Sequence, residues 1–363
     1  MAKISSLVAA AAIGLGALAE ASAMGNVLRA VTNPVCSATN YTDPYHQLVQ
    51  DAGYALKNAS VNDVTLSYAE GPDNGPPIVM FHAQLLDWFS YSRVMPDLAK
   101  SFHVYAVDYP GHGQTVTPDD YPMNANQIGG DLATFIEQEI GQPVNVTGNS
   151  SGGLLALWLA ANRPDLVQAA VLEDPPLFSS EAANINGTIA NKAFNSSYKA
   201  TFDKPDDFLI YWIDDNSQYF VNNIGLGTPT ILKGAVRMTR KCKPDQPVEI
   251  GMLKNDDTDR MLLRGLDHQY DPRFGAAFYD GTWNEGFSHA DALAKVACPT
   301  LLMQANFNYT ADGILNGAMS QEDADKAMSL LQDGTYQRVN ATHVVNLDAP
   351  DVWLTAVKGF FGQ

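Results

Sequence analysis

The segment that most constrains the fold is a short turn of glycine and serine, Gly148-Asn149-Ser150-Ser151-Gly152-Gly153. An apolar run over residues 144–147 precedes it and a strongly apolar run over residues 154–161 follows it, so the turn joins a buried strand to a buried helix. In a G-x-S-x-G turn of this kind, small neighbours let strand and helix approach closely and hold the serine on a tight turn. The pattern predicts that Ser150 is a nucleophile. The alternative is a glycine-rich turn with a structural serine.

Short apolar strands alternate with helical patterns after residue 60. This alternation predicts an α/β fold with a mostly parallel sheet covered by helices. The expected strands cover residues 64–69, 78–81, 103–107, 144–147, 169–172, 300–304 and 336–339, and the expected helices cover residues 128–140, 154–161 and 352–361.

The alternation lapses between residues 176 and 294, where the pattern is helical, irregular and rich in aromatic residues. An insertion between two core strands is typical of a cap over a site at the carboxyl ends of the strands. We therefore expect a core over residues 61–175 and 295–363, a cap over 176–294 and an N-terminal extension over 24–60. Trp212 and Trp283 are candidates for binding a small-molecule substrate. The alternative is that these rings form the core of the cap.

The first residues have the pattern of an export signal. Lys3 precedes an uncharged apolar stretch, and Ala21-Ser22-Ala23 fits a cleavage site. The stretch is shorter than the ~20 residues of a membrane-spanning helix. We expect a signal peptide over residues 1–23 and a secreted protein, with a retained anchor as the alternative. The net charge of −18 and the lack of a Lys/Arg run argue against binding to nucleic acid or to anionic membranes.

Three cysteines are present, which an oxidising compartment permits to form one disulfide. Cys298 opens an apparent buried strand, so Cys36–Cys242 is the favoured pair. No Cys/His spacing is typical of a metal site, and we expect neither a metal nor a cofactor. Sequons for glycosylation occur at several positions, among them Asn40, Asn58, Asn186 and Asn195.

A serine hydroxyl needs a base within hydrogen-bond reach to become a nucleophile. His343 is the candidate base, because it follows the strand expected over 336–339 and precedes the final helix. Among the other histidines, His82 and His112 are assigned to turns, and His46, His268 and His289 are expected on the solvated surface.

The chain resembles the α/β-hydrolases from about residue 60 to its end, apart from the cap. The resemblance lies in the G-x-S-x-G elbow and in the loop after His343, where an acidic residue and a proline follow. The His-Gly of the family is here His82-Ala83-Gln84. Matching to the family implies an oxyanion hole formed by the backbone N–H groups of Gln84 and Ser151, which stabilises charge on a tetrahedral intermediate.

The acid of the triad departs from the common pattern of the family. The matching position after the cap is Asn308, which cannot balance an imidazolium. Some members, such as haloalkane dehalogenases and the fungal zearalenone lactonase, carry the acid one strand earlier, about 24 residues after the nucleophile. Asp174 lies at that spacing and is the expected acid, with Glu173 and Asp312 as alternatives. Its role is to orient the histidine.

The resemblance implies a serine hydrolase that cleaves an ester or lactone of a small, partly apolar substrate through an acyl-enzyme. Haloalkane dehalogenases and epoxide hydrolases place a carboxylate at the elbow, so a serine argues against their chemistry. Carbon–carbon bond hydrolysis or lyase chemistry on the same triad is one alternative. A binding protein with the hydrolase fold and no turnover is another. The sequence predicts neither the natural substrate nor the oligomeric state.

Overall fold

The computed structural model describes residues 36, 41–223, 225–253, 256–267 and 270–362. The expected signal peptide, the Asn40 sequon and His268 lie outside these residues. Over the described ranges, no helix combines the length and the apolar character that crossing a membrane requires.

A central sheet of eight strands is formed in the described part of the chain, in the order β1-β2-β4-β3-β5-β6-β7-β10. β1 and β2 run antiparallel to their neighbours, and the strands from β4 to β10 in this order pair in parallel. The strands are β1 (Ala55–Val61), β2 (Val64–Glu70), β3 (Pro77–Phe81), β4 (His103–Asp108), β5 (Val144–Asn149), β6 (Val167–Glu173), β7 (Thr300–Gln304) and β10 (Gly334–Arg338).

The sheet begins earlier than the boundary expected at residue 61, because β1 belongs to it. β1 is an edge strand, and its first four residues are exposed. Its sequence therefore lacks the apolar run by which the other strands are detected. A second, two-stranded sheet pairs β8 (Asn308–Tyr309) with β9 (Leu315–Asn316).

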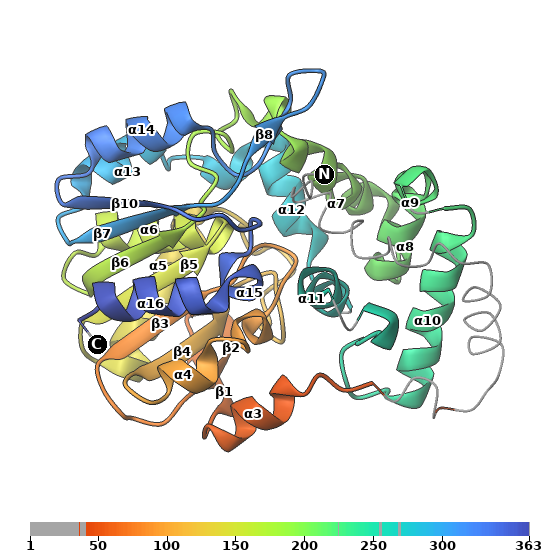
Figure 1. Ribbon diagram of the computed structural model, residues 1–363, viewed down its shortest axis with the longest axis horizontal. Coiled ribbons are helices and arrows are strands. Elements are labelled where there is room, and N and C mark those ends of the chain that lie inside the picture. Colours follow the sequence, from red (N-terminus) through yellow and green to blue (C-terminus); the bar gives the residue numbers. More distant parts are fainter. Residues whose placement is uncertain (1–35, 37–40, 224, 254–255, 268–269, 363) are drawn as a thin grey trace.

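Helices cover both faces of the central sheet. In Figure 1, α4 and α16 lie in front of the sheet and contact each other, and α5, α6 and α13 pack together behind it. α6 is apolar on all sides and almost entirely buried, as expected of a helix in the middle of a core. The elements of the core are α3 (Tyr45–Asp51), η2 (Trp88–Tyr91), α4 (Met95–Leu98), α5 (Ala125–Phe135), η3 (Ile136–Ile140), α6 (Ser151–Asn162), α13 (His289–Lys295), α14 (Gln321–Leu330), α15 (Val345–Asp348) and α16 (Pro350–Phe360).

The segment between β6 and α13 forms a group of helices beside the carboxyl ends of the strands (Figure 1). α13 itself packs on α6 and α14 of the core, although the expected cap ran to residue 294. Within this group α7 and α12 pack closely on each other. Its elements are η4 (Ile185–Gly187), α7 (Ile189–Asp203), α8 (Phe208–Asp215), α9 (Ser217–Asn223), α10 (Thr228–Cys242), η5 (Gly251–Leu253), α11 (Asp257–Leu266), α12 (Pro272–Asp280) and η6 (Thr282–Asn284). We call this group the cap.

Two sets of contacts fix the cap. A disulfide joins Cys36 to Cys242 at the end of α10, which confirms the expected pairing, and Cys298 is a half-buried free thiol. On the core side, the guanidinium of Arg264 in α11 donates to the carboxylate of Asp87 at 2.8 Å, and both side chains are buried. α11 thus lies directly on the loop that follows β3.

Candidate active site

The elbow between β5 and α6 holds Ser150 in a strained backbone conformation, with φ 58° and ψ −121°. Two glycines make this turn possible. A Cβ at Gly148 would lie 2.1 Å from the carbonyl oxygen of Gly152, and a Cβ at Gly152 would lie 2.1 Å from the carbonyl oxygen of Phe81. Strand β5, helix α6 and the end of β3 therefore meet at distances that only glycine allows.

The register of β5 and β6 brings Ser150 beside Asp174. Asn149 pairs with Glu173, and the backbone N–H of Ser150 donates to the carbonyl of Glu173 at 2.9 Å. The side-chain amide of Asn149 donates to that same carbonyl at 3.2 Å and to the carbonyl of His343 at 2.9 Å. One buried amide thus ties the elbow, the end of β6 and the histidine loop together.

Asp174 and His343 form a hydrogen-bonded pair. Oδ2 of Asp174 lies 2.7 Å from Nδ1 of His343, and its Oδ1 accepts from the backbone N–H of Ala305 at 3.0 Å. A carboxylate accepts, so Nδ1 carries the proton and Nε2 presents its lone pair. Nε2 is buried and has no hydrogen-bond partner among the described residues. The geometry supplies an oriented base on one side of the elbow.

The two backbone groups expected to form the oxyanion hole lie at the ends of neighbouring strands. Gln84 follows β3, Ser151 begins α6, and the contact of Gly152 with Phe81 holds these two segments together. Neither N–H group donates to an acceptor within the described ranges of the chain. Two backbone donors are thus free next to Ser150, as stabilisation of an oxyanion requires.

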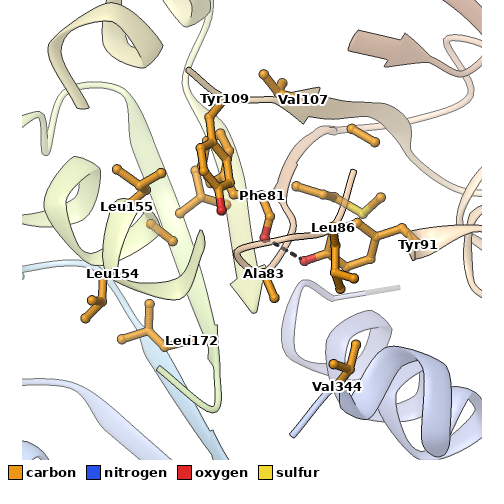
Figure 2. Close-up of a cluster of buried hydrophobic side chains, with 14 of the residues drawn as sticks. Phe81, Ala83, Leu86, Tyr91, Val107, Tyr109, Leu154, Leu155, Leu172 and Val344 are labelled. Atoms are coloured by element: carbon orange, nitrogen blue, oxygen red, sulfur yellow. Dashed lines mark hydrogen bonds between the residues drawn. The ribbon is translucent and has the colours of Figure 1, made fainter. Parts of the chain in front are cut away.

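An apolar cluster packs around these segments. Figure 2 shows Phe81 and Ala83 at the end of β3 packed with side chains of β4, α6 and β6, and the hydroxyl of Tyr91 donates to the carbonyl of Phe81 at 2.9 Å. The hydroxyl of Tyr109, also in this cluster, lies 2.9 Å from Oγ of Ser151. The loops that carry the site therefore pack on a buried apolar core.

Comparison with known proteins agrees with this architecture. A family model described as the alpha/beta hydrolase fold matches residues 76–223. A putative lipase from Acinetobacter baumannii superposes with a TM-score of 0.58 at 20% identity over 89% of this chain and 97% of the lipase. The enol-lactonase from Burkholderia xenovorans superposes with a TM-score of 0.56 at 16% identity over 85% of this chain and 100% of the lactonase. The chain is an α/β-hydrolase-fold protein.

Curated relatives match this α/β-hydrolase-fold protein over shorter stretches. A pimeloyl-[acyl-carrier protein] methyl ester esterase from Chromobacterium violaceum is 33% identical over 105 residues, which is 29% of this chain and 39% of the esterase. The chloroplastic pheophytinase from Arabidopsis thaliana is 27% identical over 114 residues, which is 23% of this chain and 24% of that enzyme. The chain thus spans well under half the length of these relatives.

The alternative acids occupy other environments. Oε1 of Glu173 accepts from the backbone N–H of Asn346 at 3.0 Å, and Oε2 accepts from the indole N–H of Trp353 at 2.7 Å. Burial raises the pKa of Glu173 to about 8. Asp312 and Asn308 are exposed in and beside the β8–β9 hairpin. Of the candidate carboxylates, Asp174 is the one that contacts His343.

Trp212 and Trp283 both lie inside the cap. Trp212 packs edge-on against Phe220, and Trp283 stacks on Phe278 with ring centroids 4.4 Å apart. Both indoles are buried. These positions match the alternative interpretation, in which the rings form the core of the cap. A role of either ring in substrate binding stays a prediction.

Three of the other histidines are buried, and one of them departs from the expectation. His82 and His112 lie in buried turns beside Tyr109, and burial lowers the pKa of His82 to about 4. The expectation of a solvated His289 is wrong, because its ring is fully buried and its Nδ1 accepts from the backbone N–H of Phe178 at 2.9 Å. His289 follows no apolar run, so the sequence carries no signal of its burial.

Two further residues of the site have no signal in the sequence. Asn149 is the variable position of G-x-S-x-G, and its amide contacts become visible only in the folded chain. Tyr270 comes from the irregular cap and contacts the side chain of Gln84. Within the described residues, no group of three or more His, Cys, Asp or Glu side chains is arranged to hold a metal ion.

Proposed function

We propose that this chain is a serine hydrolase that cleaves an ester or lactone of a small, partly apolar substrate through an acyl-enzyme. The observation that carries the proposal is the 2.7 Å hydrogen bond between Asp174 and His343, which leaves Nε2 of His343 as a free acceptor. Together with the strained elbow at Ser150, this is the arrangement that activates a hydroxyl for attack on a carbonyl.

The residues act in two half-reactions. In the first, Nε2 of His343 takes the proton of Ser150 as Oγ forms a bond to the carbonyl carbon, and the N–H groups of Gln84 and Ser151 bind the oxyanion. Collapse breaks the ester C–O bond, and the leaving alkoxide takes the proton from Nε2. In the second, a water molecule loses its proton to Nε2 and attacks the acyl-enzyme, which releases the acid and restores Ser150.

The burial of the site limits the size of the substrate. Ser150 and His343 are both buried, and the cap contacts the loop after β3 through Arg264. An enclosed site favours a compact substrate over a polymer that lies in an open groove. A relative named as a methyl ester esterase and structural neighbours named as a lipase and an enol-lactonase support acyl-transfer chemistry.

A fluorophosphonate probe tests the nucleophile directly. We expect the probe to label the wild type, and we expect 4-nitrophenyl acetate and butyrate to be turned over. Ser150→Ala should abolish both signals. Ser151→Ala is the matched control, because it removes the neighbouring hydroxyl, keeps the backbone N–H and should still be labelled. An unlabelled wild type, or a labelled Ser150→Ala variant, contradicts the proposal.

We also infer that the chain is exported. The Cys36–Cys242 disulfide supports this inference, because disulfides persist in oxidising compartments. The charged and apolar pattern of residues 1–23 supports it independently. The sequons at Asn58 and Asn186 lie on exposed residues, and glycosylation stays a prediction. Expression of the full chain with a C-terminal tag, followed by N-terminal sequencing of the exported protein, should give a chain that begins at Met24. Retention inside the cell with Met1 intact contradicts export.

A further inference from the structure

The side chain of Gln84 is only half satisfied. Its Nε2 donates to the hydroxyl oxygen of Tyr270 at 2.6 Å. Its Oε1 is buried and accepts no hydrogen bond from any residue that the structure describes. The same residue supplies a backbone N–H of the proposed oxyanion hole. An unused acceptor therefore belongs to the same residue whose backbone N–H would bind the substrate carbonyl.

The position of this amide is fixed from both sides. Tyr270 is buried in the cap and packs against the ring of His112, with centroids 5.2 Å apart, and against Phe208. On the core side, a Cβ at Gly265 of α11 would lie 2.1 Å from the carbonyl oxygen of Leu85, so cap and loop are in direct backbone contact. The amide nitrogen of Gln84 is thus held against the cap, and its amide oxygen remains without a hydrogen-bond donor.

A buried acceptor without a donor is costly. The group gives up its hydrogen bonds to water on folding and gains none in return, which destabilises the folded protein. A site with a buried unpaired polar group also discriminates strongly between a substrate that carries the complementary group and an analogue that lacks it. The unpaired oxygen therefore has the chemistry of a specificity element for a ligand that brings an O–H or N–H.

We propose that Gln84 determines substrate specificity, with Oε1 accepting a hydrogen bond from an O–H or N–H group on the acyl part of the substrate, close to the scissile carbonyl. Tyr270 is the positioning residue that holds the amide in this orientation. The substrate class is then an ester or lactone of a hydroxy acid or an acylamino acid. This inference rests on the proposed function.

Matched pairs of 4-nitrophenyl esters test the proposal, because a methyl group replaces a hydroxyl at nearly equal size. The pairs are 2-hydroxypropanoate with 2-methylpropanoate, 3-hydroxybutanoate with 3-methylbutanoate, and 2-hydroxybenzoate with 2-methylbenzoate. The measured quantity is the ratio of kcat/KM for the hydroxyl and methyl members, divided by the same ratio for hydroxide-catalysed hydrolysis. For the wild type we expect a corrected ratio of about ten or more in at least one pair.

Three variants assign that preference to the amide. Gln84→Met keeps the length of the side chain and the backbone N–H, so it should bring the ratio close to one by lowering kcat/KM for the hydroxyl ester more than for the methyl ester. Tyr270→Phe keeps the amide but frees its orientation, so it should lower the ratio less. Gln218→Met, at an exposed glutamine of α9, is the control and should leave the ratio unchanged.

Each other outcome overturns the inference. A wild type without preference in any pair excludes an acceptor at this position. An equal loss for both members of a pair in Gln84→Met means that the amide serves the oxyanion or the packing of the cap. If Gln84→Met does not fold, the ratio in Tyr270→Phe decides, and an unchanged ratio counts against the proposal. If the fluorophosphonate probe leaves wild-type Ser150 unlabelled, the proposed function fails first, and this inference fails with it.

Discussion

Asp174→Asn is the substitution that separates the two proposed roles of this carboxylate, hydrogen bonding and control of the histidine tautomer. In the wild type both oxygens accept, Oδ1 from the N–H of Ala305 at 3.0 Å and Oδ2 from Nδ1 of His343 at 2.7 Å. The amide that replaces the carboxylate has one oxygen. Because the N–H of Ala305 can only donate, this oxygen must face Ala305, and the NH2 group of the amide must face His343.

This arrangement inverts the tautomer of the histidine. Nδ1 of His343 then accepts from the amide, so the proton moves to Nε2, and Nε2 can no longer accept the proton of Ser150. In serine proteases the same acid-to-amide change lowers kcat by about 10⁴-fold. At 1.36 kcal/mol for each factor of ten, this corresponds to about 5.5 kcal/mol of lost transition-state stabilisation. The KM should change little, because both carboxylate oxygens face protein groups, Nδ1 of His343 and the N–H of Ala305.

Steady-state hydrolysis of 4-nitrophenyl butyrate measures the loss, and thermal unfolding checks that the variant is folded. Substitutions at two other acidic residues serve as controls. Asp312→Asn is at an exposed residue and should leave kcat unchanged. Glu173→Gln should act mainly on stability, because its NH2 group would face the N–H of Asn346 or the indole N–H of Trp353. An Asp174→Asn enzyme within tenfold of the wild type, or an Asp312→Asn enzyme with the larger defect, would refute the tautomer argument.

Three further substitutions have expected outcomes of their own. Gly152→Ala places a Cβ 2.1 Å from the carbonyl oxygen of Phe81. It should lower the free energy of unfolding by at least the roughly 1–3 kcal/mol of an overpacked core and abolish probe labelling. An unchanged free energy of unfolding in denaturant would contradict this. Burial lowers the pKa of His289 to about 3, so this residue destabilises the native state as the pH falls from 6.5 toward 3. His289→Gln lacks this titration, so the difference between the free energies of unfolding of the wild type and the variant should shrink by roughly 3 kcal/mol between pH 7 and pH 4.5. A difference that stays constant in urea titrations would count against the lowered pKa of His289. Cys36→Ser removes a disulfide between residues 206 positions apart, so the free energy of unfolding should fall by about 2–5 kcal/mol. Unfolding curves under non-reducing conditions that match those of the wild type would show that the disulfide does not stabilise the fold.

The elbow and the buried strands could be predicted from the sequence because their signals are local. β7 occupies residues 300–304 as expected, since a buried parallel strand is a continuous apolar run. The elbow is equally local, because Gly148 and Gly152 are required by backbone contacts within the turn and with β3. β1 is exposed and has no such run, so its place in the sheet depends on pairing with β2 and could not be predicted.

The contacts of the cap could not be predicted for a different reason. Its aromatic residues follow no period that separates rings facing a substrate from rings facing one another, and Trp212 and Trp283 lie among other aromatic rings. The contact between Tyr270 and Gln84 joins residues 186 positions apart and depends on how the cap folds onto the loop after β3. Only the structure supplies that information.

The choice between Glu173 and Asp174 shows where sequence spacing reaches its limit. Glu173 is the last residue of β6, and Asp174 follows it in a left-handed conformation with φ 42°, so a difference of one position decides which carboxylate meets the histidine. In the structure, both carboxylates bind the loop that carries His343. Asp174 binds the ring of His343, and Glu173 binds the backbone N–H of Asn346 and the indole of Trp353 in α16. Because the two carboxylates belong to consecutive residues, the end of β6 fixes the histidine loop at two points. These hydrogen bonds hold the histidine loop at the end of β6, which is how this chain orients its base without an acid at Asn308.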